Sequence, residues 1–141
     1  MFWTKNAPLK FVRKSVSDSL SSTFAPREIE ELSSIATLVD IDEGQKLTVE
    51  GTTGREVLVI VSGTASVLRG AEVVASVGPG QFVGEIASLS GARRNATVVA
   101  DTDMTVYAMS NPEFSALLTR CPLLERRVTT GAVRRLADAK A

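Results

Sequence analysis

Two charged residues, Glu85 and Arg94, stand nine positions apart in a short stretch that follows a Gly-Pro-Gly turn at 78–80. Arg94 carries a planar guanidinium whose donors suit two phosphate oxygens. Glu85 does not suit a phosphate, because an ionised carboxylate only accepts hydrogen bonds, but it suits a hydroxyl such as a ribose 2′-OH. One cation and one acceptor so arranged indicate a pocket for a sugar phosphate.

The stretch around this pair, residues 80–99, predicts a strand, a glycine corner, one short helical turn, a loop and a second strand. Gly84 stands at the corner, where a missing Cβ lets the backbone turn sharply and a ligand approach. The residues after Gly84 would present free backbone N–H groups at a helix N-terminus, where anions bind. The second strand is predicted from the β-branched run Thr97-Val98-Val99.

This stretch resembles the phosphate-binding cassette of cyclic nucleotide-binding domains, the cAMP- and cGMP-sensing modules of protein kinase A regulatory subunits, catabolite activator proteins and nucleotide-gated channels. The family pattern is roughly Phe-Gly-Glu-Leu-Ala, a loop and Arg-x-Ala-x-Val. Here it reads Val-Gly-Glu-Ile-Ala at 83–87 and Arg-Asn-Ala-Thr-Val at 94–98. The resemblance implies that Glu85 holds the ribose 2′-hydroxyl and Arg94 the exocyclic phosphate oxygens. The ligand-binding residues that it implies are Val83, Gly84, Glu85, Ile86, Ala87, Arg94, Asn95 and Ala96.

Two positions depart from the family pattern, and two roles stay open. Val83 replaces the usual aromatic residue. Asn95 stands where many cAMP binders have Ala or Ser and cGMP binders often have Thr, which leaves the choice of base open. Glu85 could instead cap backbone amides or pair with Arg94 in the empty protein. The neighbouring Arg93 is expected to face solvent.

The composition excludes several classes of protein. With 141 residues, we expect a single domain that buries its own core. The absence of histidine excludes Ser-His and Cys-His catalysis and His-based metal sites, so we expect no enzyme, no metal and no cofactor. The 16 basic and 16 acidic residues balance, which gives nucleic-acid binding no support. A single cysteine, Cys121, and the lack of a signal peptide or transmembrane segment predict a cytoplasmic protein.

The order of apolar and turn residues predicts a mainly β fold, a sandwich or barrel with flanking helices. The family resemblance implies that it is an antiparallel jelly-roll-like β-barrel (β-roll). We expect residues 1–25 to form an N-terminal amphipathic helix or extension, with its helix at about 9–20. This helix would dock on the barrel or, alternatively, contact a partner, a second subunit or a membrane surface. Residues 26–141 would form the nucleotide-binding domain, with the cassette at 83–98 and C-terminal helices at 111–139 that act as a lid. The predicted strands are Ala36–Ile41, Gln45–Thr48, Glu56–Ser62, Thr64–Leu68, Glu72–Val77, Thr97–Ala100 and Met104–Met109.

The last predicted helix carries an apolar stripe, and its arginines lie mostly off that stripe. These arginines are too few, and lack aromatic neighbours, for a nucleic-acid surface. Arginine stacks well on aromatic rings, so one of them, or an apolar neighbour, could cover the purine base. The candidates for this base lid are Arg127, Val128 and Gly131. The terminal helices could also pair two copies of the chain as a homodimer.

These observations together predict a module that binds a cyclic nucleotide, cAMP in preference to cGMP, and that couples binding to movement of its C-terminal helix. Its output would pass to a separate effector protein or to an output domain outside this sequence. The alternative is a protein-interaction scaffold with the same fold and no nucleotide. Glu85 and Arg94 argue against that alternative, since a scaffold has no need of the pair.

Overall fold

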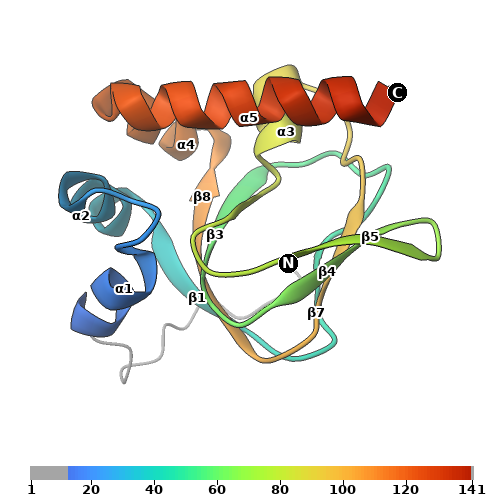
Figure 1. The fold of residues 1–141 in the computed structure, drawn as a ribbon, viewed down its shortest axis with the longest axis horizontal. Helices are drawn as coiled ribbons and strands as arrows, with labels where there is room; N and C mark the ends of the chain where they lie inside the picture. The colour runs from blue at the N-terminus through green and yellow to red at the C-terminus, as the bar shows by residue number, and fades with distance from the viewer. Residues whose placement is uncertain (1–12, 141) are drawn as a thin grey trace.

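A computed structural model describes residues 13–140, in which two antiparallel four-stranded sheets face each other and helices cover one side (Figure 1). The first sheet has the order β1-β8-β3-β6, and the second has the order β2-β7-β4-β5. The strands of the first sheet are β1 (Thr37–Ile41), β8 (Met104–Ser110), β3 (Glu56–Ser62) and β6 (Phe82–Val83). Those of the second are β2 (Lys46–Thr48), β7 (Thr97–Ala100), β4 (Ala65–Arg69) and β5 (Glu72–Val77).

Strand β3 forms part of both hydrophobic cores, because its side chains alternate between the two faces of the first sheet. Leu58 and Ile60 lie in the core between the sheets, together with residues such as Val98 of β7. Val57 and Val59 lie in the second core, between the first sheet and the helices. This placement explains why β3 is an uninterrupted apolar run rather than an alternating one.

Five helices complete the described part of the chain: α1 (Arg13–Leu20), α2 (Pro26–Ile35), α3 (Glu85–Ser90), α4 (Asn111–Arg120) and α5 (Pro122–Lys140). Leu20, Leu32, Phe114 and Leu124 bring α1, α2, α4 and α5 into the helix-side core. The long α5 runs across α4 and α3, at the top of Figure 1, and contacts both. The C-terminal helix is therefore in contact with the short helix of the cassette.

The fold class predicted from the sequence is confirmed, as a β-roll of two separate sheets rather than a closed barrel. Each predicted strand lies within two residues of its observed bounds. Ser110 caps α4, as its hydroxyl accepts a hydrogen bond from the Glu113 N–H. Residues 9–12 of the first predicted helix lie outside the described residues. No helix among residues 13–140 is long and apolar enough to cross a membrane.

Helix α1 is docked on the sheet, as one of the two alternatives for it proposed. Val16, Leu20 and Phe24 are buried in the same core as residues of β3 and α4. Residues before position 26 thus contribute to the core of the domain, and the division at 25/26 stays a prediction.

Truncating Leu20 tests this docking. Leu20 is fully buried, so Leu20→Ala is expected to lower the free energy of unfolding by about 2–5 kcal/mol. Leu123 of α5 is 67% exposed, and Leu123→Ala should change it by no more than about 0.5 kcal/mol. Equilibrium urea denaturation measures both. Equal effects of the two substitutions would show that α1 does not contribute to the core.

Candidate functional site

A cavity of about 370 Å³ lies between the cassette and the second sheet. Strands β4 and β5 and the end of β7 supply one wall, which includes Val67, Val77 and Val98. The other wall is the cassette itself. The cavity is lined by every residue predicted to bind ligand, namely Val83, Gly84, Glu85, Ile86, Ala87, Arg94, Asn95 and Ala96. The structure thus brings the two halves of the motif to one place.

Gly84 forms the corner between β6 and α3, as the sequence indicates. It is the N-cap residue of α3 and has φ 87° and ψ 0°, a left-handed conformation that glycine adopts without strain. A Cβ at this position would overlap Nη1 of Arg94 and approach the Glu56 carbonyl oxygen to 2.9 Å. Glycine is therefore required both by the turn and by the arginine packed against it.

The Arg94 side chain lies between Gly84 and Gly54, and a Cβ on Gly54 would also overlap its guanidinium. Nη2 donates a hydrogen bond to the backbone carbonyl of Glu56 at 2.7 Å. Nη1 is out of contact with solvent and has no hydrogen-bond acceptor among the residues that the structure describes. A buried donor of this kind is unusual, because leaving one unsatisfied costs free energy. Arg94 therefore lies at the cavity with one terminal nitrogen, Nη1, that can still donate a hydrogen bond.

The charge of Arg94 is maintained in a partly buried position. Burial lowers the pKa of Arg94 from its usual value, while the negative charges of Glu56 and Glu85 act in the opposite direction. Arginine starts from so high a pKa that it stays protonated. Glu85 has only 1% of its surface exposed, and its negative charge acts on the Arg94 guanidinium from within the protein. A cation and a hydrogen-bond acceptor therefore face the same cavity.

Backbone hydrogen bonds join the loop before β3 to the loop after α3. The backbone N–H of Arg94 donates to the Thr52 carbonyl at 2.8 Å, and that of Gly51 donates to the Arg94 carbonyl at 2.9 Å. Arg93 is exposed, as expected, and its Nη1 donates to the Gly51 carbonyl at 3.0 Å. The sequence analysis did not predict the contact of Gly54 with Arg94, because no local sequence pattern indicates a contact between residues forty positions apart.

The base-lid candidates lie away from the cavity. Arg127 pairs with Glu28 of α2 at 2.7 Å, and Val128 is buried in the helix-side core. Gly131 lines a separate hollow on α5 with Arg126, Arg127 and Thr130. None of these three lines the cavity, and their role as a lid stays a prediction. Among the side chains that the structure describes, those of residues 16–131, no group of three or more His, Cys, Asp or Glu could hold a metal ion.

Comparison with known proteins agrees with this geometry. The model of the cyclic nucleotide-binding domain matches residues 38–121. The potassium/sodium hyperpolarization-activated cyclic nucleotide-gated channel 2 of Mus musculus is 34% identical over 93 residues, which are 66% of this chain and 11% of the channel. Channel 4 of Oryctolagus cuniculus is also 34% identical over 93 residues, 66% of this chain and 8% of that protein. The chain thus spans about a tenth of the length of these relatives.

Solved structures show the same fold. The Thermus thermophilus catabolite activator protein superimposes with a TM-score of 0.73 and 27% identity, over 86% of this chain and 60% of that one. The structure of PKAR CBD2 with bound Sp-2Cl-cAMPS has a TM-score of 0.69 and 21% identity, over 91% of this chain and 90% of that one. The matching family model, the shared β-roll and the assembled cassette lead to one conclusion: the chain belongs to the cyclic nucleotide-binding domain family.

Proposed function

We propose that this domain binds a cyclic nucleotide in the cavity beside the cassette, as a regulatory sensor without catalytic chemistry. The observation that carries the proposal is the buried Arg94 guanidinium, whose Nη1 has no acceptor among the described residues although it lies at the cavity. An exocyclic phosphate oxygen would supply that acceptor, and hydrogen bonds between two charged groups are the strong ones. A cavity of about 370 Å³ is within the range of small-ligand sites.

Nη1 is closed off from solvent, and this constrains how the phosphate can bind. The phosphate reaches Nη1 only if the guanidinium turns or the corner at Gly84 shifts, because Nη1 lies directly against Gly84. Binding would therefore move the start of α3. Since α3 contacts α5, a change at the cassette would pass to the C-terminal helix, which is the proposed reporting element.

The ribose and the purine of the ligand are assigned to residues that line the same cavity. The Glu85 carboxylate would accept a hydrogen bond from the ribose 2′-hydroxyl, because it lines the cavity and accepts only. The apolar wall formed by β4 and β5, with Val67 and Val77, would take the purine. The preference for cAMP over cGMP, an effector outside this chain, a cytoplasmic location and dimerisation through terminal helices are expectations from the sequence analysis and stay proposals.

Arg94 is the first residue to test, by thermal melting with cAMP, cGMP and 5′-AMP. A ligand that binds only the folded state stabilises it by about 2.7 kcal/mol at a hundredfold excess over its Kd, a shift in Tm on the order of 10 °C. Removing a charge-assisted contact should weaken binding roughly 10- to 100-fold in Arg94→Ala. Its shift, measured against its own ligand-free melting temperature, should then fall to a fraction of the wild-type value.

Arg93→Ala is the matched control, because Arg93 is the adjacent arginine and is exposed. It should keep the full shift. The three ligands also rank the bases and test the need for a cyclic phosphate. If none of them stabilises the wild-type protein, the sensor proposal fails and the scaffold alternative takes its place.

Glu85→Gln tests the ribose contact without changing the size of the side chain. Wild-type protein should bind cAMP roughly tenfold or more tightly than 2′-deoxy-cAMP, because only cAMP has the 2′-hydroxyl that Glu85 would accept. A neutral amide makes a weaker hydrogen bond than a carboxylate, so the ratio of the two Kd values should shrink severalfold in the variant. Isothermal titration calorimetry measures both ligands. An unchanged ratio would place the 2′-hydroxyl elsewhere.

A further inference from the structure

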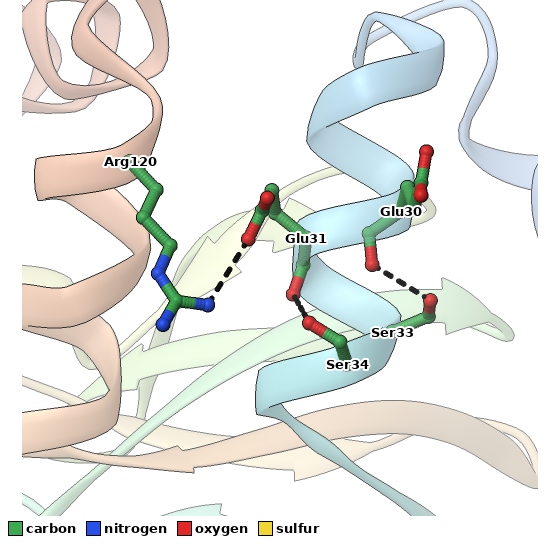
Figure 2. A network of polar contacts seen from close by, with 5 residues as sticks. All are labelled: Glu30, Glu31, Ser33, Ser34 and Arg120. Atoms are coloured by element: carbon green, nitrogen blue, oxygen red, sulfur yellow. Dashed lines mark hydrogen bonds and ion pairs between the residues drawn. The ribbon is translucent and has the colours of Figure 1, made fainter.

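Two carboxylates of α2 form ion pairs with arginines of the C-terminal helices α4 and α5. Glu31 pairs with Arg120 of α4 at 3.3 Å, and Figure 2 shows Arg120 reaching from its own helix to that carboxylate. Glu28 pairs with Arg127 of α5 at 2.7 Å. The first ion pair ties α4 to α2, and the second ties α5, which is the helix proposed to report ligand binding.

The Glu28 carboxylate is the more deeply buried of the two, with 8% of its side chain exposed against 25% for Glu31. Its Oε1 accepts hydrogen bonds from Arg127 Nη2 and, at 2.9 Å, from the backbone N–H of Ala25. A buried carboxylate that loses its cation is left with an uncompensated charge, which is strongly unfavourable. Arg127, with half of its side chain exposed, can be solvated by water instead. The cost of separating the pair therefore falls mainly on Glu28.

Helix α5 connects this ion pair to the cassette, because it carries Arg127 and also contacts α3. The next residue, Val128, is buried in the helix-side core. A movement of α5 that brought these residues over the cavity would withdraw Arg127 from Glu28. We propose that the Glu28–Arg127 pair is an autoinhibitory latch, which holds α5 on α2 in the ligand-free protein and lowers the apparent affinity for cyclic nucleotide. This proposal rests on the proposed function, since it requires that nucleotide binding moves α5.

The variant that tests the latch is Glu28→Gln. An amide oxygen can still accept the Ala25 N–H, so the start of α2 keeps its cap, but the charge that holds Arg127 is gone. The matched control is Glu31→Gln, which frees Arg120 of α4 and leaves α5 tied. Two quantities are measured: the Kd for cAMP by calorimetry, and the hydrogen exchange of the α5 amides without ligand.

A latch stabilises only the ligand-free arrangement, so removing it raises the fraction of protein that is competent to bind. We expect Glu28→Gln to bind cAMP about two- to tenfold more tightly than wild type and to exchange its α5 amides faster. Glu31→Gln should leave both quantities close to wild type. If Glu28→Gln does not fold, Arg127→Gln breaks the same pair from its exposed side and should exchange its α5 amides faster without ligand; unchanged exchange in that variant would overturn the latch.

The outcomes separate the latch from the function on which it rests. If wild-type protein binds cAMP and no variant that breaks the pair binds it more tightly, the latch is overturned and the sensor proposal stands. If wild-type protein binds neither cAMP nor cGMP, the sensor proposal fails. The latch proposal then fails too. The exchange data in that case show only whether Glu28 stabilises the position of α5.

Discussion

The site depends on one constraint, the placement of a guanidinium below the surface of the protein. Arg94 fits there because two neighbours, Gly54 and Gly84, have no side chain. The carbonyl of Glu56 satisfies one terminal nitrogen and leaves the other without an acceptor in the described structure. Since an arginine keeps its charge in such surroundings, the result is a cation fixed in position and incompletely satisfied. This is the property that a receptor for an anionic group needs, because the protein bears the cost of orienting the donor before the ligand arrives.

The rest of the fold makes this placement rigid and connects it to the helices. Glu56 is the first residue of β3, the strand buried on both faces between the two cores. The acceptor that holds Arg94 therefore belongs to the strand that is part of both cores. The residues on either side of Arg94 are joined to the loop before β3 by backbone hydrogen bonds. On the other side, α3 contacts α5, and α5 is tied to α2 through Glu28. The α3 helix of the cassette thus contacts both the central strand β3 and the C-terminal helix α5.

Sequence reasoning could predict what depends on local pattern. The cassette was predicted because its glycine, carboxylate and arginine lie close together in the sequence, and β3 because its apolar run is uninterrupted. The role of Gly54 could not be predicted, since it follows from a contact across forty positions. The cavity wall from β5 was also missed, because its exposed side chains follow no motif. Helical periodicity predicted which face of α5 is apolar, but not which neighbour it packs against, so the pairing of Arg127 with Glu28 was not foreseen.

The most direct test of a poised phosphate receptor is a crystal structure of the protein with cAMP bound. The structure should place an exocyclic phosphate oxygen within hydrogen-bonding distance, about 2.7–2.9 Å, of a terminal nitrogen of Arg94. The corner at Gly84 or the guanidinium should be displaced relative to the ligand-free protein, because Nη1 is closed off from solvent without ligand. A nucleotide bound elsewhere, or one bound at the cassette with Arg94 still directed only at the Glu56 carbonyl, would contradict the assignment of Arg94 as the phosphate receptor.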